Sequence, residues 1–312
     1  MAEINNYLDY INFSVTNNSK DLIEKTENRY SSIIQSIAKR IANSHGHTAI
    51  MLSGPSASGK TTTAFKIADE LKALGIAAYT ISLDDFYMNK CDAMLLEDGT
   101  PDLESVHALD LEFINRTLNK LIVEGESDLP IFDFTIGRRS DKTKHIKLNE
   151  DDVIIVEGLH ALNPLITECL PKDSLLKLYI NVSSRIYGKN RRIILNKRNL
   201  RFSRRLVRDY QFRSSSVENT YMLWQTVLRG EELYLSPYKA YADLRINSIH
   251  IYEPCVLKQI VIPLLESEMN NDGFAYRKEA KKLIRGLKSF EDIDLSLVPS
   301  DSLLREFLGE NV

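Results

Sequence analysis

The stretch GPSASGKT, residues 54–61, places two glycines, a lysine and a hydroxyl residue at a spacing that suits phosphate binding. It matches the pattern G-x-x-x-x-G-K-[ST] at every defined position and follows an apolar run directly. Gly54 and Gly59 allow a tight turn that brings backbone N–H groups onto phosphate oxygens, and the helix expected next adds its positive N-terminal end. We therefore expect a phosphate-binding loop, in preference to a glycine turn with a chance lysine.

The residue types of this loop indicate ATP and Mg²⁺ as cofactors, although the sequence does not decide between ATP and GTP as the donor. Lys60 can reach the β- and γ-phosphates, and the Thr61 hydroxyl is placed to ligate Mg²⁺. The residues expected to bind ATP are consecutive: Gly54, Pro55, Ser56, Ala57, Ser58, Gly59, Lys60, Thr61 and Thr62.

A regulatory GTPase would share such a loop, and NKCD at residues 89–92 matches the guanine-reading pattern N-K-x-D. That stretch comes just after the second expected strand, whereas a base reader should follow a later strand. No glycine of the chain has an aspartate three residues before it, so the D-x-x-G switch is missing as well. The sequence therefore argues against a GTPase.

Two further carboxylates follow expected strands, in SLDDFY (82–87) and VEG (156–158). In a parallel sheet, both strand ends lie at the edge where ligands bind, beside the phosphate loop. Asp84 and Glu157 are thus expected to flank one Mg-nucleotide, with Asp84 orienting or deprotonating an acceptor hydroxyl. The alternative is that both residues are solvated loop starts.

A basic region supplies positive charge, because residues 185–213 hold eleven of the forty Lys and Arg residues and one acidic residue, Asp209. Four of its arginines share one helical face by their spacing: Arg201, Arg204, Arg205 and Arg208. We expect a mobile arginine lid that closes over a triphosphate. A solvated basic helix and a nucleic-acid patch are the alternatives, and the local surplus and few aromatic residues argue against nucleic acid.

Strands and helices alternate along the chain, which predicts an α/β fold of the P-loop NTPase type: three layers with a mainly parallel sheet. Expected strands span residues 47–52, 77–83, 152–158 and 175–182, an edge strand spans 242–248, and a hairpin spans 129–148. Expected helices span residues 21–44, 62–75, 103–125, much of the region up to 233, 254–268, 275–288 and 302–309. We expect residues 1–20 to be loosely ordered.

Composition is ordinary for a globular protein, with 312 residues, 43% hydrophobic residues and a net charge of −3. Three cysteines without a CxxC pair, no signal peptide and no run of 18 apolar residues predict a cytoplasmic chain with reduced thiols and no membrane span. The expected division is a polar segment and helix (1–44), a P-loop α/β domain (45–250, with the lid at about 200–216) and a helical extension packed on it (251–312).

Six motifs stand in the order found in a known family: GPSASGKT (54–61), SLDDFY (82–87), PIFDF (130–134), IIVEGLHALNP (154–164), RRLVRDYQFR (204–213) and YADLRINS (241–248). With these, the chain resembles the phosphoribulokinase/uridine kinase family of P-loop kinases. It is most similar to a bacterial subgroup of uridine kinase-like nucleoside kinases, and that likeness runs to about residue 310.

The resemblance implies roles for individual residues. Asp84 would act as base toward a ribose 5′-hydroxyl and help hold magnesium, Glu157 would sit near Mg²⁺, and Asp102 would bind ribose hydroxyls. The implied catalytic residues are Lys60, Asp84 and Arg208, the metal ligands are Thr61, Asp84 and Glu157, and Arg205 joins the ATP contacts. The implied substrate contacts are Asp84, Tyr87, Asp102, Phe132, Arg139, Arg208 and Arg213.

The sequence departs from the family pattern at positions that matter for the choice of acceptor. Phe132 stands where uridine kinases have Tyr, Gly137 stands where they have a pyrimidine-reading His, and Ser214-Ser215 replace Gly-Arg. Because a hydrogen-bonding reader discriminates strongly among substrates, its loss leaves the base unspecified. The sequence predicts phosphorylation of a nucleoside or similar ribose-bearing molecule. A sugar phosphate, pantothenate, or a non-enzymatic P-loop protein that binds nucleotide or nucleic acid remain alternatives.

Two points stay open. His160, two residues after Gly158, is read either as a catalytic group or as a structural histidine, and a lone His without a partner visible in the sequence favours the structural role. The sequence also leaves open whether the chain forms a homo-oligomer.

Overall fold

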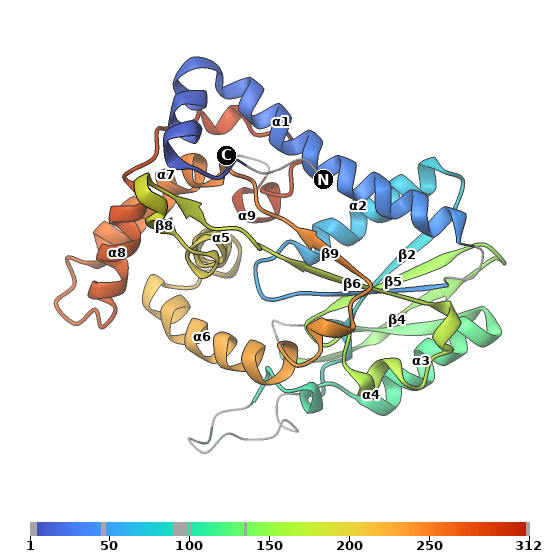
Figure 1. Ribbon diagram of the computed structural model, residues 1–312. Coiled ribbons are helices and arrows are strands. Elements are labelled where there is room, and N and C mark those ends of the chain that lie inside the picture. Colours follow the sequence, from blue (N-terminus) through green and yellow to red (C-terminus); the bar gives the residue numbers. More distant parts are fainter. Residues whose placement is uncertain (1–4, 45–47, 90–98, 100–101, 134–135, 310–312) are drawn as a thin grey trace.

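The computed structural model describes residues 5–44, 48–89, 99, 102–133 and 136–309. Its centre is a five-stranded parallel sheet in the order β2-β5-β1-β6-β9 (Figure 1). The strands are β1 (Ala49–Ser53), β2 (Ala78–Ser82), β5 (Val153–Gly158), β6 (Leu175–Asn181) and β9 (Leu244–Asn247). The predicted α/β fold with a mainly parallel sheet is confirmed.

Two antiparallel pairs lie outside this sheet, and helices cover both of its faces. The pairs are β3 (Glu126–Asp133) with β4 (Arg138–Lys147), and β7 (Ile186–Tyr187) with β8 (Ile193–Leu195). The helices are α1 (Leu8–Asn43), α2 (Lys60–Ala73), α3 (Leu111–Glu124), α4 (Pro164–Thr167), α5 (Lys197–Arg213), α6 (Val217–Gly230), α7 (Glu253–Glu268), α8 (Arg277–Leu287) and α9 (Arg305–Leu308).

The central strands are buried on both faces, so apolar side chains follow one another without polar interruption. In β1, Ile50 and Leu52 join the hydrophobic core that contains α1, α2 and α7. Ala49 and Met51 point to the opposite core, beneath α3 and α4. Alternate side chains of β1 therefore pack into two different cores, one on each face of the sheet. Because β1, β2 and β5 are parallel, their carboxyl ends lie at one edge of the sheet.

The predicted positions of the sheet strands and of the 129–148 hairpin are confirmed, whereas two helix starts were wrong. α1 begins at Leu8, not near residue 21, because Ile11 and Val15 are buried at helical spacing ahead of the kink at Asn18. α3 begins at Leu111, where the Asp110 side chain accepts from the N–H of Phe113 and caps the helix. The short β7–β8 pair had no sequence signal that we recognised.

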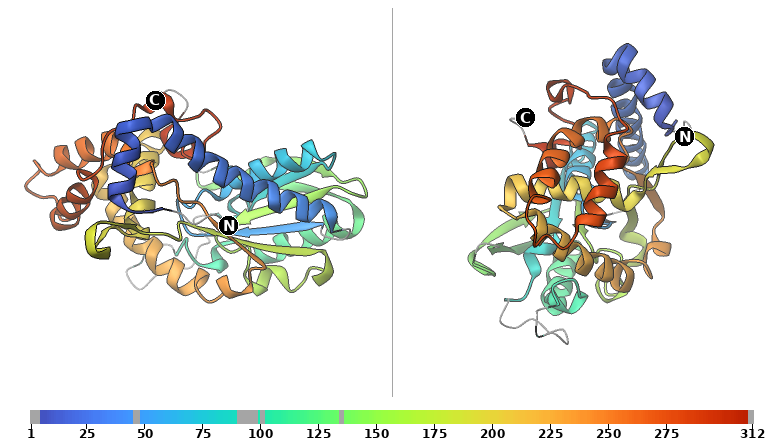
Figure 2. Two further views of the ribbon diagram at one scale, coloured as in Figure 1. Left: turned by 45° about the horizontal axis from the view of Figure 1, so that its top comes forward. Right: turned by 90° about the vertical axis from the view of Figure 1, so that its left-hand side faces the viewer.

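Helices from the two ends of the chain pack into the same core as α2, on one face of the sheet. Figure 2 shows α1 running along α2 and the sheet, with the orange and red C-terminal helices at one end of the molecule. α7 packs on α5 and α8, and α9 packs on α5. In the described part of the chain, no helix has the length and apolar character to cross a membrane. Cys169 and Cys255 are free thiols, and Cys91 lies outside the described residues.

Candidate active site

The phosphate loop joins β1 to α2 in a conformation that depends on its small residues. Gly59 has φ +90° and Ala57 has φ +57°, both in the left-handed region. A side chain at Gly54 would collide with the carbonyl oxygen of Ile180 on β6. The Ser58 hydroxyl is buried and has no hydrogen-bond partner among the described residues. A polar group left unsatisfied in this loop fits an anion that would accept its hydrogen bond.

Side chains from the α5–α6 region hold the loop at Ser56. Arg201 donates to the Ser56 carbonyl oxygen at 3.0 Å, and Glu231 accepts from the Ser56 N–H at 3.0 Å. Arg201 and Glu231 also form a two-point ion pair, at 2.6 and 2.8 Å. Arg205 donates to the Ser56 hydroxyl at 3.0 Å. The loop is therefore braced by the helices that follow the sheet.

Thr61 and Glu157, both expected near the metal, meet at the start of α2. The Thr61 hydroxyl donates to Glu157 Oε1 at 3.0 Å, and the Ser82 hydroxyl donates to the same oxygen at 3.2 Å. Burial raises the pKa of Glu157 to about 7, against the effect of Lys60, while Asp84 raises it further. One hydroxyl and one buried carboxylate at this corner are oxygen donors of the kind that Mg²⁺ takes.

Asp84 lies just beyond β2, in the short 3₁₀ turn Leu83–Phe86, whose start is capped by the Ser82 hydroxyl. Its side chain is accessible to solvent, but the protein atoms around it displace part of its hydration, and this desolvation raises the pKa of Asp84. Lys60, Arg213 and Arg208 act in the opposite direction and lower that pKa. Lys60 of the loop and Arg208 and Arg213 of α5 therefore lie near enough to Asp84 for their charges to act on it.

Asp209, the one acidic residue of the basic region, gathers the arginines expected in the lid. Its carboxylate is 2% exposed and lies 3.0 Å from Arg205 Nε, 2.8 Å from Arg208 and 3.7 Å from Arg213. Arg204 is fully buried and paired with Glu253. These contacts exclude the alternative of a solvated basic helix.

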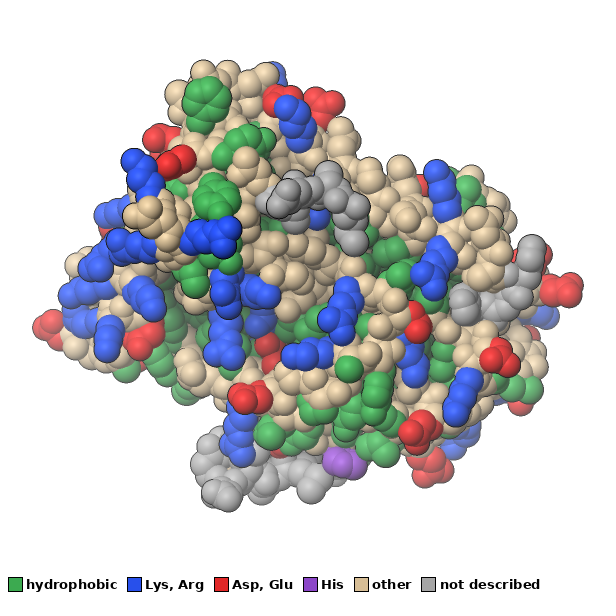
Figure 3. Space-filling view, in the orientation of Figure 1, with side chains coloured by type: hydrophobic (Ala, Val, Ile, Leu, Met, Phe, Trp, Pro, Cys, Tyr) green, Lys and Arg blue, Asp and Glu red, His purple; other side chains and the backbone are tan. Residues whose placement is uncertain are grey.

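A nucleic-acid patch was one alternative for the basic region, and it would require the α5 arginines to lie on the surface. Lys and Arg side chains gather on the part of the molecule that carries α5 and α8 (Figure 3). Arg201, Arg204 and Arg205 do not contribute to that surface, because each is at most 7% exposed. These three arginines point into the protein, and each donates to a residue of the phosphate loop.

The side expected to bind the acceptor is built from the turn after β2 and the β3–β4 hairpin. The rings of Tyr87 and Phe132 lie 5.9 Å apart, and the Phe132 N–H donates to Asp85 at 3.1 Å. Arg139 is held by the carbonyl oxygens of Phe86 and Tyr87 and by Asp110 at 3.0 Å. Its guanidinium thus fastens the hairpin to the sheet, a role that the sequence did not suggest.

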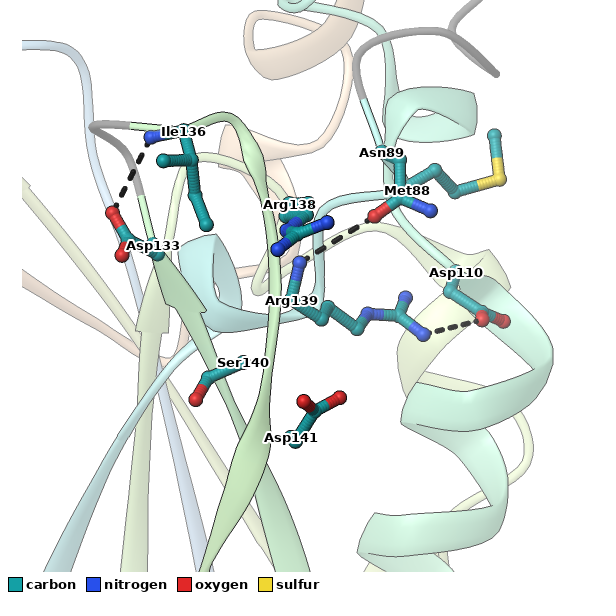
Figure 4. Close-up of a pocket in the computed structure, with 9 residues that line it drawn as sticks. All are labelled: Met88, Asn89, Asp110, Asp133, Ile136, Arg138, Arg139, Ser140 and Asp141. Carbon is teal, nitrogen blue, oxygen red and sulfur yellow. Dashed lines mark hydrogen bonds and ion pairs between the residues drawn. The ribbon is translucent and has the colours of Figure 1, made fainter.

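A cavity of about 590 Å³ lies between this hairpin and the Met88–Asn89 segment (Figure 4). None of its lining residues belongs to the phosphate loop. Gly137, at φ +67°, turns the hairpin next to it. Charged and polar side chains dominate the lining: Met88, Asn89, Asp110, Asp133, Ile136, Arg138, Arg139, Ser140 and Asp141. Only a polar or charged ligand would suit these walls.

The segment carrying Asp102 and Glu104 lies against the end of α6, where Glu104 is next to Gly230. Asp102 accepts from the Tyr234 hydroxyl at 3.0 Å. Burial raises the pKa of Glu104 to about 7, with Arg205 opposing the shift. His160 is 4% exposed beside the Tyr234 ring, and burial lowers its pKa to about 4, so its ring is neutral near pH 7.

Sequence reasoning missed Glu104, Glu231 and Tyr234, which come to the cleft from outside the quoted motifs. Their sequence neighbourhoods carry no recognisable spacing, so only the folded chain brings them there. Asp209 had a usable signal, because it is the single acidic residue in a basic helix and stands four residues from Arg205 and from Arg213. Lys90 to Asp92 of the NKCD stretch lie outside the described residues.

Comparison with known proteins shows the family of this chain. The family model named Phosphoribulokinase / Uridine kinase family matches residues 49–253. The uridine kinase of Limosilactobacillus reuteri is 30% identical over 196 residues, covering 62% of this chain and 80% of that protein. The uridine kinase of Macrococcus caseolyticus is 29% identical over 201 residues, covering 64% and 87%. The solved structure of a possible uridine kinase from Bacillus stearothermophilus aligns with a TM-score of 0.45 at 18% identity, over 68% of this chain and 96% of that one. The chain belongs to the phosphoribulokinase/uridine kinase family, and it is a P-loop kinase.

Proposed function

We propose that this kinase uses ATP and Mg²⁺ to phosphorylate the 5′-hydroxyl of a nucleoside or of a similar small molecule that carries ribose. The observation that carries the proposal is Asp84, an accessible carboxylate just beyond the end of β2, on which the charges of Lys60, Arg208 and Arg213 act. Phosphoryl transfer to an alcohol needs such a group on the acceptor side and positive charge on the donor side.

The donor side has groups that fit a nucleoside triphosphate. The loop amides, the unsatisfied Ser58 hydroxyl and Lys60 would hold phosphate oxygens, and Lys60 Nζ now lies 3.4 Å from the Pro55 carbonyl oxygen. Thr61, Glu157 and Asp84 would hold Mg²⁺, whose contribution is to neutralise charge on the phosphate oxygens. The oxygen donors at this corner are those that the metal prefers.

On the acceptor side, Asp84 would accept the proton of the attacking hydroxyl as its oxygen forms the new bond to phosphorus. The oxygen of the departing diphosphate takes the electron pair of the bond that breaks. Arg205, Arg208 and Arg213 would neutralise charge on the departing group, and Asp209 holds these guanidiniums toward the cleft. The Arg205 and Arg208 side chains are only 9% and 15% exposed, which makes their interaction with charge stronger than it would be in water.

Asp102 would bind ribose hydroxyls, while Tyr87 and Phe132 offer two rings against which the acceptor can pack. We infer that the far end of the acceptor enters the polar cavity in Figure 4. Gly137 presents no side chain there, so the uracil edge lacks the histidine reader of uridine kinases. Arg138 and Asp141 line the cavity and would recognise a polar group of another shape.

The test is an acceptor panel assayed for ADP release with Mg-ATP: the common nucleosides, ribulose 5-phosphate and pantothenate, with Mg-GTP as a second donor. Release that depends on a nucleoside, with the phosphate found at the 5′ position by mass spectrometry and NMR, is the expected result. Turnover only with ribulose 5-phosphate or pantothenate would assign another acceptor.

A non-enzymatic protein would bind ATP without acceptor-dependent ADP release, and its affinity for RNA or DNA would fall steeply with salt. Titration of labelled RNA and DNA at two salt concentrations, run beside the panel, separates this alternative from the kinase.

A further inference from the structure

The segment that carries α9 packs on the start of the P-loop helix α2. The Thr62 hydroxyl donates to Glu306 Oε2 at 2.6 Å, and the Thr62 N–H makes a longer contact of 3.4 Å with the same oxygen. A Cβ added at Gly59 would lie 2.5 Å from Leu303 Cδ1. A carboxylate from the end of the chain thus lies against the turn that begins α2, outside the region matched by the family model.

The position of this carboxylate is held by contacts that do not involve Glu306. Ser302 donates to Glu27 at 2.6 Å, tying the segment to α1. Phe307 lies under the Arg204 guanidinium, 5.3 Å from its centre, and is fully buried. Because Leu303, Ser302 and Phe307 anchor the segment, Glu306 is presented to Thr62 by a rigid scaffold.

The charge of Glu306 matters because of where it lies. The first turn of a helix carries unpaired N–H groups and a positive end, and in a P-loop these groups are the ones that phosphates take. Thr62 is in that turn, two residues after Lys60. Glu306 also reaches the metal corner electrostatically: burial raises the pKa of Glu157, and Asp84 and Glu306 add to the rise.

We propose that Glu306 is an anionic competitor built into the donor site, which holds the Thr62 N–H and hydroxyl until a nucleotide phosphate displaces it. The carboxylate thereby sets the affinity of the site for phosphate. This inference rests on the proposed donor binding, and it assigns the C-terminal segment a role in tuning it. No bond is made or broken, since one acceptor oxygen replaces another at the same donors.

The decisive variant is Glu306→Gln, which keeps an oxygen for the Thr62 hydroxyl and removes the charge. We expect the Kd for ATP, measured by calorimetry without acceptor, to fall about threefold to tenfold. The Kd for inorganic tripolyphosphate should fall by a similar factor, because the competition concerns phosphate and not the base. Both gains should shrink as salt rises from about 50 mM to 500 mM, since the repulsion is screened.

The matched control is Asp301→Asn, in the same segment. Asp301 pairs with Lys66 on α2 at 3.2 Å, is largely exposed and lies away from the start of the helix, so its Kd values should equal those of the wild type. Unchanged or weaker ATP binding by a folded Glu306→Gln variant would overturn the inference, as would failure of both Glu306→Gln and Glu306→Ala to fold. A wild-type chain that binds neither ATP nor tripolyphosphate would instead refute the proposed donor site.

Discussion

Replacing Glu157 by Gln should stabilise the metal-free, nucleotide-free protein at pH 8 and have little effect at pH 5. Glu157 is 6% exposed, and burial raises its pKa from 4.5 to about 7. Because the folded state binds this proton more tightly than the unfolded state, the stability that the group contributes is present below pH 4.5 and is lost as pH rises through 7. The shift corresponds to about 3 kcal/mol lost at pH 8 and less than about 1 kcal/mol at pH 5.

Gln keeps an oxygen that can accept from Thr61 and Ser82, and it carries no charge that must be desolvated. Urea unfolding in the presence of EDTA at pH 5 and pH 8 measures the difference. The control Glu150→Gln changes an exposed carboxylate between β4 and β5 and should show no such dependence on pH. A gain of equal size at both pH values, or a loss at pH 8, would refute the reasoning that burial of this charge costs stability.

Further variants test the other parts of the cleft. Asp84→Asn should lower kcat by about 10²–10⁴-fold while the Kd for ATP stays nearly unchanged, and wild-type turnover would show that Asp84 is not the base. Asp209→Asn removes the negative charge that balances the buried Arg205 and should lower the free energy of unfolding in urea by about 3 kcal/mol; an unchanged value would contradict the placement of this pair. Gly54→Ala forces a methyl group against Ile180 and should weaken ATP binding measured by calorimetry, whereas wild-type affinity would argue against so close an approach.

The part of the fold that sequence predicted well is the part with strong local signals. Apolar runs such as 153–156 identify strands buried on both faces, and their carboxyl ends bring Asp84 and Glu157 to the edge that holds the phosphate loop. The pairing of Thr61 with Glu157 follows from this register, in which Leu52 lies beside Glu157. Local pattern and parallel topology were therefore sufficient to bring Thr61 and Glu157 together.

The environment of the α5 arginines depends on long-range packing. The basic spacing in α5 predicted one arginine face correctly in outline, but a solvated basic helix and a buried, paired helix have the same local sequence. Which one forms depends on Glu231 and Glu253, whose carboxylates come from elements later in the chain. Arginines at helical spacing predict a charged helix face. Only the carboxylates that pair with them show whether water or protein covers that face.

The same reasoning explains why side chains outside the matched family region contribute to the proposed donor site. Tyr30 of α1 shares a hydrogen bond of 2.6 Å with Thr63, and Thr63 donates in turn to the Gly59 carbonyl oxygen at 2.5 Å. Leu303 fills the space above Gly59 from the other end of the chain. Since Gly59 must hold φ +90° for the loop to face a phosphate, side chains outside residues 49–253 stabilise the conformation on which binding depends. A chain trimmed to those residues should therefore lose affinity for ATP even where its catalytic groups are all present.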